Sequence, residues 1–176
     1  MVARTAVRSE GFSWTKVTIA RHCKMARMPT VPELEELASR TELAQAKAHA
    51  GDFRGAASEF RTLTKDYART AGADDPQTLA VRLDLARVLG TAKQYARAID
   101  TCEPLLRDQV RVLGPDHADV LETRQLLASL RYSAGDTAGA AEDLEQLLAA
   151  LSRVLMPTHD RITKVKRDIA FLKRTT

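Results

Sequence analysis

The sequence is poor in cysteine, glycine and proline, and it has no long apolar run. Among its 176 residues are two cysteines, Cys23 and Cys102, which lie far apart and form no ligand pattern. No disulfide framework is indicated, and we expect a reducing, cytoplasmic location. Lys16 interrupts the apolar stretch 12–20, so we expect neither a signal peptide nor a membrane span. Eight glycines and six prolines are few, a composition that favours helix.

Catalytic motifs are missing as well. The sequence has no glycine-rich nucleotide loop, no His-Arg-Asp and no Asp-Phe-Gly, so it does not indicate a kinase. His22-Cys23 has no oriented base or oxyanion site to activate the thiol. His117 and His159 share one position of a repeat, but no further ligands accompany them to form a metal site. We therefore expect a protein that is not an enzyme and uses no cofactor or metal.

The positive charge is unevenly distributed. The net charge is +4, yet residues 1–30 alone hold six basic residues against one acid, Glu10. We interpret residues 1–30 as a basic arm, loosely ordered or with a short helix over about 13–27. Two alternatives remain open: the arm packs on the first repeat and covers its apolar end, or it contacts nucleic acid or an acidic surface. Nucleic acid is the weaker hypothesis because it depends on the arm alone.

What the sequence does contain is a 42-residue repeat. Residues 113–121 (Leu-Gly-Pro-Asp-His-Ala-Asp-Val-Leu) recur as 155–163 (Leu-Met-Pro-Thr-His-Asp-Arg-Ile-Thr), with a weaker copy at 72–79. A fixed period of this size indicates a stacked array of units. Apolar residues hold fixed positions in each unit: Leu43, Leu85, Leu127 and Ile169; Ala44, Ala86, Ala128 and Ala170; Ala56, Ala98 and Ala140; Phe60, Cys102 and Leu144; Leu63, Leu105 and Leu147. Two closely packed helices per unit require this pattern.

Turn residues divide each unit into two helices. Gly51-Asp52 and Gly135-Asp136 predict tight helix-to-helix turns, with Lys93-Gln94 at the same position of the second unit. Asp74 and Asp116 are predicted to cap the next first helices. The predicted helices are 33–50, 53–70, 76–91, 94–112, 117–133, 136–154 and 159–174, with Pro104 expected to kink the fourth. These make three hairpins and a lone, basic final helix that closes the apolar end.

The connector, the Leu-Ala positions and the Gly-Asp turns resemble tetratricopeptide repeats, in the 42-residue form of kinesin light chains. The resemblance covers about residues 33–174 and implies an all-α right-handed superhelix of helical hairpins. The repeat domain is expected over 31–176, with units at about 33–72, 75–114 and 117–156 and a capping helix at 158–174. The chain also resembles, more loosely, helical-repeat tails of actinobacterial Ser/Thr protein kinases, in architecture only.

The resemblance implies that the first helix of each unit lines a concave groove. The implied groove residues are Thr41, Glu42, Gln45, Leu83, Asp84, Arg87, Gln125, Leu126, Ser129, Arg167, Asp168 and Phe171, with Tyr132 one turn further on. Kinesin light chains often carry two asparagines before the Leu-Ala pair, and this chain has none there. Four cations share one position: Arg40, Arg82, Arg124 and Lys166. They either form ion pairs within the fold or present a cationic row to an acidic or phosphorylated partner.

These features predict a non-enzymatic scaffold that binds a partner peptide or domain in the groove, and the cationic row would favour an acidic partner. The alternative is an accessory or regulatory repeat region of a Ser/Thr kinase or another signalling protein. No membrane partner is expected, and the sequence leaves the oligomeric state open.

Overall fold

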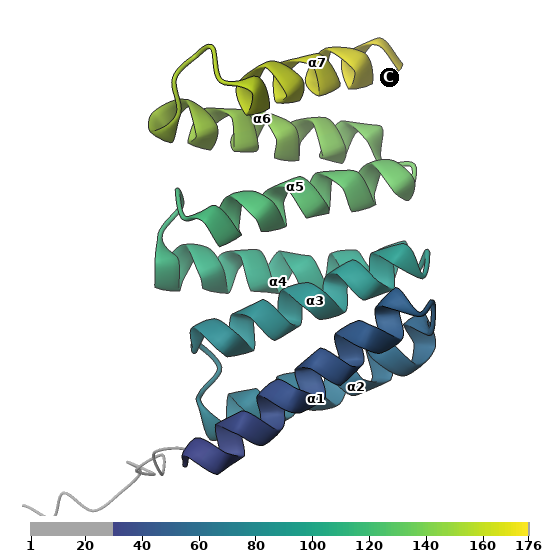
Figure 1. The fold of residues 1–176 in the computed structure, drawn as a ribbon. Helices are drawn as coiled ribbons and strands as arrows, with labels where there is room; N and C mark the ends of the chain where they lie inside the picture. Colours follow the sequence, from purple (N-terminus) through teal and green to yellow (C-terminus); the bar gives the residue numbers. More distant parts are fainter. Residues whose placement is uncertain (1–29, 176) are drawn as a thin grey trace, which may run out of the picture.

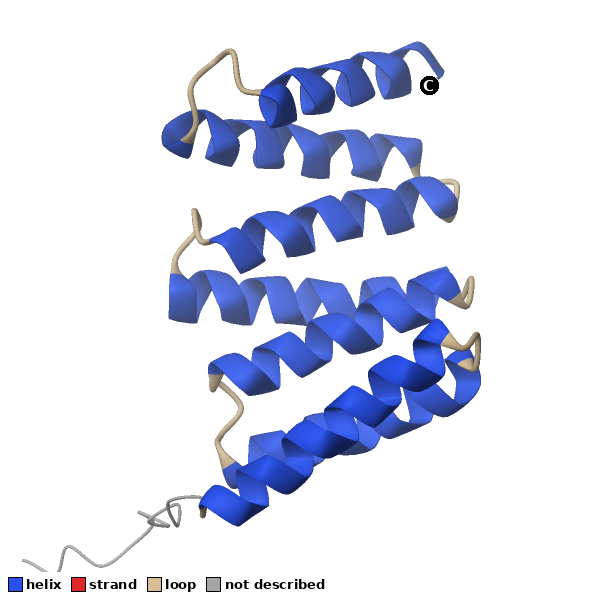
Figure 2. Cartoon of the chain, in the orientation of Figure 1, coloured by secondary structure: helices blue, strands red, loops and turns tan. Residues whose placement is uncertain are grey.

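The computed structural model describes residues 30–175, which form seven helices and no strand. The helices are α1 (Val31–His49), α2 (Phe53–Thr70), α3 (Pro76–Thr91), α4 (Tyr95–Leu113), α5 (Ala118–Ser133), α6 (Thr137–Val154) and α7 (Asp160–Thr175). Each packs on the next along the chain, so the helices stack in sequence order (Figures 1 and 2). The predicted all-α solenoid of three hairpins and a lone final helix is confirmed. None of the described helices is long and apolar enough to cross a membrane.

The turn inside the first and third hairpins depends on an Asp and two glycines. Asp52 caps α2 by accepting the Gly55 N–H at 2.8 Å, and Asp136 caps α6 through Gly139 in the same way. A Cβ on Gly55 would lie 2.1 Å from the Asp52 carboxylate, so this cap geometry requires glycine. Gly51, directly before the N-cap Asp52, has φ +85°, a left-handed conformation that glycine adopts without steric cost.

The second hairpin makes the same turn with less suitable residues. Lys93 occupies the position of Gly51 and adopts φ +58°, which costs a residue with a Cβ about 1–2 kcal/mol. Gln94 stands at the N-cap of α4 and makes no side-chain cap hydrogen bond. The turn nevertheless forms, because packing of α3 on α4 imposes the hairpin geometry.

The connectors between units differ from the sequence prediction. Asp75 and His117, not Asp74 and Asp116, are the N-caps of α3 and α5: their side chains accept the N–H groups of Gln77 and Asp119. Each N-cap lies one residue further along the chain than predicted because the glycine three residues before it, Gly72 or Gly114, turns the chain with a positive φ.

Asp74 and Asp116 instead bind arginines of the following unit. Asp74 pairs with Arg111 at the end of α4, and Asp116 pairs with Arg153 at the end of α6, each through two nitrogens of the guanidinium. The guanidinium groups hold the pKa values of these carboxyls below their ordinary range. The Asp of the connector motif therefore links neighbouring units.

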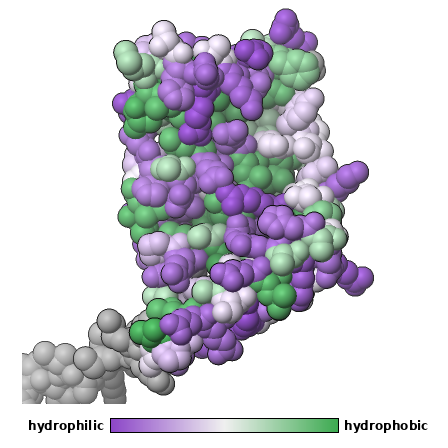
Figure 3. Space-filling view, viewed as in Figure 1, coloured by the Kyte–Doolittle hydropathy of each residue, from purple (hydrophilic) through white to green (hydrophobic). Residues whose placement is uncertain are grey.

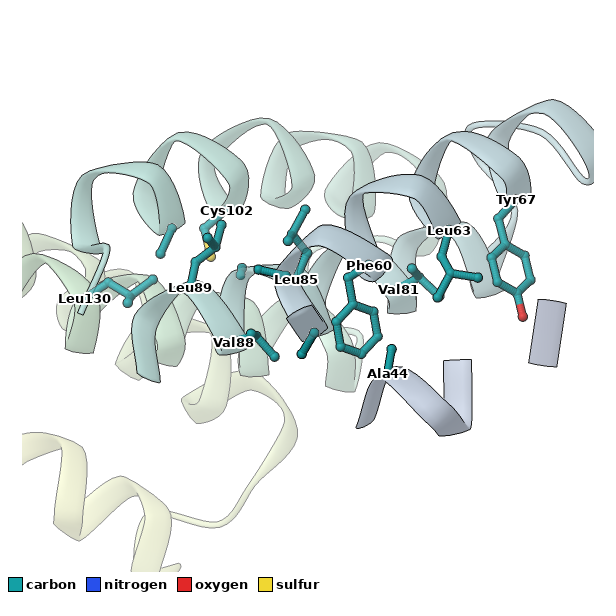
Figure 4. Packing of buried hydrophobic residues seen from close by; sticks show 14 of the residues in the cluster. Ala44, Phe60, Leu63, Tyr67, Val81, Leu85, Val88, Leu89, Cys102 and Leu130 are labelled. Carbon is teal, nitrogen blue, oxygen red and sulfur yellow. The ribbon is translucent and has the colours of Figure 1, made fainter. Parts of the chain in front are cut away.

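First helices bury the face that points toward the preceding unit. The residues on this face are Thr78, Val81, Leu85 and Val88 in α3, Val120, Thr123, Leu127 and Leu130 in α5, and Ile162, Val165, Ile169 and Leu172 in α7, all of them buried. Figure 4 shows Val81, Leu85 and Val88 beside Phe60, Leu63 and Tyr67 of α2. Stacking of units thus supplies much of the core.

The two ends of the stack break the pattern for a geometric reason. Leu43 is 55% exposed although Leu127 is 2% exposed at the same repeat position, because no described helix precedes α1. Ala170 is exposed although Ala44, Ala86 and Ala128 are buried, because no described helix follows α7. The outer face of α7 is otherwise polar (Thr163, Lys166, Lys173), which fits a capping helix.

Candidate functional site

The candidate site is the face formed by the first helices, α1, α3, α5 and α7. In Figure 1, α1 and α3 of this face lie in front of α2 and α4. Side chains join neighbouring helices along it: the Gln45 amide donates to Asp84 at 3.1 Å, and Arg87 pairs with both Asp84 and Glu122. Figure 3, from the same side, shows apolar surface between rows of polar side chains.

A hollow of about 290 Å³ lies between α5 and α7. Tyr132 and Phe171 flank it, each 48% exposed, with ring centroids 6.4 Å apart at 71°. This edge-to-face geometry is favourable for aromatic pairs. The remaining lining combines small and apolar residues with polar ones: Gln125, Ala128, Ser129, Leu144, Lys164, Asp168 and Leu172. The hollow therefore offers apolar walls with hydrogen-bonding groups among them.

A second hollow, of about 490 Å³, lies between α1 and α3. Phe53, Phe60 and Val88 contribute apolar lining, and Gln45, His49, Asp84, Arg87 and Thr91 contribute polar groups. The Arg87–Glu122 ion pair spans α3 and α5, between the two hollows. The face thus presents two separate sites rather than one uniform channel.

The predicted cationic row lies against the second helices. Arg40 donates to Glu59 and Asp66 at 2.8–3.0 Å, and Arg82 pairs with Asp108 at 2.7 Å. The hydrogen bonds that Arg40 donates to Asp66 and Glu59 raise the pKa of its guanidinium above the ordinary value. Of the other two cations, Arg124 donates to Gln146 of α6, and Lys166 of α7 is exposed. The first two cations are thus engaged in ion pairs within their own hairpins.

The other predicted groove residues divide into three groups. Gln45, Asp84, Arg87, Gln125, Ser129, Tyr132 and Phe171 line the two hollows. Leu83 is buried with Leu79 and Leu105, and Leu126 packs partly against the core. Thr41 is half-buried and donates to the Leu37 carbonyl, while Glu42 and Arg167 are exposed. Leu83 therefore belongs to the core, because α3 turns it toward α4.

Sequence reasoning missed some lining residues. Lys164 and His49 were not selected because their repeat positions carry no shared residue type, and Leu172 and Val88 were not selected because they share a buried apolar position with Leu130. Lys164 stands at the position of Ala80 and Glu122, and His49 at that of Thr91 and Ser133. A search for unusual side chains one turn from the Leu-Ala pair would have found them.

The candidate reactive residues have structural surroundings. His117 and His159 cap α5 and α7, each accepting a backbone N–H at its Nδ1 at 3.2 Å. Cys102 is buried, and desolvation raises the pKa of its thiol to about 12, which disfavours the reactive thiolate. His22-Cys23 lies outside the described residues. Within residues 30–175 no group of three His, Cys, Asp or Glu is placed to hold a metal ion.

One carboxyl group is strongly perturbed, away from both hollows. Asp143 of α6 is buried, and Arg131 of α5 lies between it and Glu103 of α4, with contacts of 2.9 and 2.8 Å. Desolvation raises the pKa of Asp143 to about 6, although Arg131 acts in the opposite direction. The shared arginine joins α4, α5 and α6, so we assign this cluster to packing of the units.

Comparisons with known proteins agree with this geometry. Residues 78–119 match the family model of the tetratricopeptide repeat. Two crystal structures of a Podosopora anserina protein described as a kinesin light chain with nearly identical TPR-like repeats are similar at 25% identity. Their TM-scores are 0.68 and 0.67, over 78% of this chain and 65% of theirs. BtubC (BKLC) from P. vanneervenii is similar at TM-score 0.70 and 18% identity, over 78% of this chain and 55% of that one. No curated protein matches the sequence.

Proposed function

We propose that this chain, whose repeats are similar to the tetratricopeptide repeats of kinesin light chains, is a non-enzymatic protein–protein interaction module. It binds an extended segment of a partner protein along the face of α1, α3, α5 and α7. A bulky apolar side chain of the partner occupies the hollow between α5 and α7, against Tyr132 and Phe171. The observation that carries this proposal is the half-exposed aromatic pair beside that hollow.

Exposed aromatic side chains on a preformed concave surface favour binding. Tyr132 and Phe171 are large, lose little conformational entropy on binding, and already contact one another, so both are suited to act as anchors. Ala128 and Leu144 complete the apolar lining, and Gln125 and Ser129 offer hydrogen bonds to a bound backbone. The hollow between α1 and α3 combines the apolar side chains Phe53, Phe60 and Val88 with polar groups, so it is suited to a second side chain of the same segment.

The charges on this face refine the class of partner. Because ion pairs engage Arg40 and Arg82, an acidic partner would have to use the cations of α7. Lys164 lies at the rim of the aromatic hollow, and Arg167 is exposed one turn away. Since Asp168 lines the same hollow, the local excess of positive charge is small. We therefore propose a partner segment that is apolar at its anchor and at most moderately acidic.

The test uses a display library of random peptides selected on the full chain. We expect selected peptides to share one bulky apolar residue and to bind about tenfold or more weakly to Tyr132→Ala and Phe171→Ala, since loss of an aromatic anchor costs more than 1 kcal/mol. Val154→Ala is the matched control: Val154 is also 48% exposed but lies on α6, and its truncation should leave binding unchanged. Undiminished binding to both aromatic variants would contradict the proposal.

A further inference from the structure

The outer face of α1 is the exposed end of the stack. It corresponds to the buried faces of α3, α5 and α7 and carries Glu36, Ser39, Leu43 and Ala46. Leu43 is 55% exposed and Val31, at the start of the same helix, is 68% exposed. The face therefore combines an uncovered apolar centre with a polar surround, and it is distinct from the two hollows.

The charge around this apolar centre is negative. Glu35, Glu36 and Glu42 are exposed on α1, and within residues 30–175 none of them forms an ion pair. Lys47 is the nearest cation on the outer side of the helix, while Arg40 is engaged by Glu59 and Asp66. A partner for this face needs cationic and apolar side chains together.

The chain itself supplies such a segment immediately before α1. Residues 1–29 contain Arg4, Arg8, Lys16, Arg21, Lys24 and Arg27 against one acid, and Phe12, Trp14, Val17 and Ile19 lie among them. This arm joins α1 at Thr30, so it is tethered beside the face at a high effective concentration. In the 42-residue register, the helix that would cover α1 corresponds to residues 11–28, one period before α2.

The lengths are compatible with contact. Leu43 lies about 20 Å along α1 from Thr30, at 1.5 Å per residue. Val17 and Leu43 are equally far from Thr30 along the chain, on opposite sides of it. Trp14 and Ala46 are also equally far from Thr30. An arm that returns antiparallel along α1 as a helix would therefore bring Val17 and Trp14 to the exposed apolar centre.

We propose that the basic N-terminal arm docks on the outer face of α1, with Trp14 and Val17 against Leu43 and its cations near Glu35, Glu36 and Glu42. The arm thereby closes the N-terminal end of the stack, as α7 closes the other. This docking is independent of partner binding in the hollows, because it uses the opposite side of α1.

Trp14 makes the proposal testable, since it is the only tryptophan in the chain. Its fluorescence emission and its quenching by acrylamide report on the arm alone. In the folded full chain we expect blue-shifted emission and protection from quenching, compared with the chain in concentrated urea. Leu43→Lys should remove this protection, and so should Glu35→Lys combined with Glu36→Lys. Val154→Lys, at a residue exposed to a similar degree on α6, should leave it unchanged.

All three variants alter exposed positions, so circular dichroism should show unchanged helix content. High salt should weaken the protection, because exposed charges are screened. The proposal is overturned if Trp14 in the folded chain is quenched as readily as in urea. It is also overturned if protection survives both α1 variants, which would place the arm elsewhere, or if protection disappears on dilution, which would place it on a second copy.

Discussion

Truncating the same repeat position in two different units tests the stacking geometry most directly. Leu43 and Leu127 occupy equivalent positions of α1 and α5, but Leu127 is 2% exposed and Leu43 is 55% exposed. Leu127 lies in the cluster formed with residues of α1 to α4, whereas no described helix covers Leu43. The two substitutions therefore remove the same atoms from a packed and from an open environment.

The expected magnitudes differ by several-fold. Leu127→Ala should cost about 3 kcal/mol, within the range of about 2–5 kcal/mol for buried leucines, because it leaves a cavity between two units. Leu43→Ala should cost about 1 kcal/mol or less, because the described helices leave 55% of Leu43 exposed and only the proposed docking of the arm would cover it. For a chain of this length, about 3 kcal/mol corresponds to a fall in Tm of roughly 6–12 °C.

The assay is urea and thermal unfolding of the full chain, followed by circular dichroism at the helical band. Each variant is compared with the unsubstituted chain at the same protein concentration. Equal losses at the two positions would refute the argument that the preceding unit buries this face. A larger loss for Leu43→Ala than for Leu127→Ala would reverse the assigned order of the stack.

Two further predictions concern single positions. Lys93→Gly should stabilise the chain by about 1 kcal/mol, because Lys93 adopts φ +58° where the other hairpins have glycine; an unchanged urea midpoint would be inconsistent with this strain. Asp143 has a pKa raised to about 6, above its value near 4 in the unfolded chain. Protonated Asp143 therefore favours the folded state, and this contribution to stability is lost as the pH rises through 6. Lowering the pH from 7.5 to 5 should therefore stabilise the unsubstituted chain relative to Asp143→Asn by about 1 kcal/mol. Parallel pH profiles of the two urea midpoints would contradict this assignment.

Local sequence signals located the helices closely. Every predicted helix begins and ends within two residues of the observed one, because the 42-residue period, the apolar positions and the Gly-Asp turns all depend on nearby residues. The connector shows where local reasoning fails. Asp116 has a suitable spacing for an N-cap, but a glycine with positive φ shifts the turn and gives the cap to His117. Arg153, which binds Asp116, is 37 residues away and could not be paired by spacing.

Some of the groove residues could be predicted from the sequence, and others depended on the tertiary structure. Repeat register placed Gln45, Arg87, Tyr132 and Phe171 on the first-helix face, where they line the hollows. The same register placed Leu83 there, yet α3 buries it. Adjacent positions on a helix differ by about 100°, and only the crossing of α3 with its neighbours decides which of them remains exposed.

The sequence by itself determined the all-α repeat, its period, its turns and its polar final helix, since each follows from the local geometry of the chain. Tertiary structure alone decided which equivalent residues are buried and which charges are paired. Leu43 and Leu127 share a repeat position but differ in exposure, because burial depends on whether another unit lies beside them. Arg40 and Lys166 share a repeat position, but α2 supplies carboxylates to Arg40, whereas no described helix follows α7 to pair with Lys166.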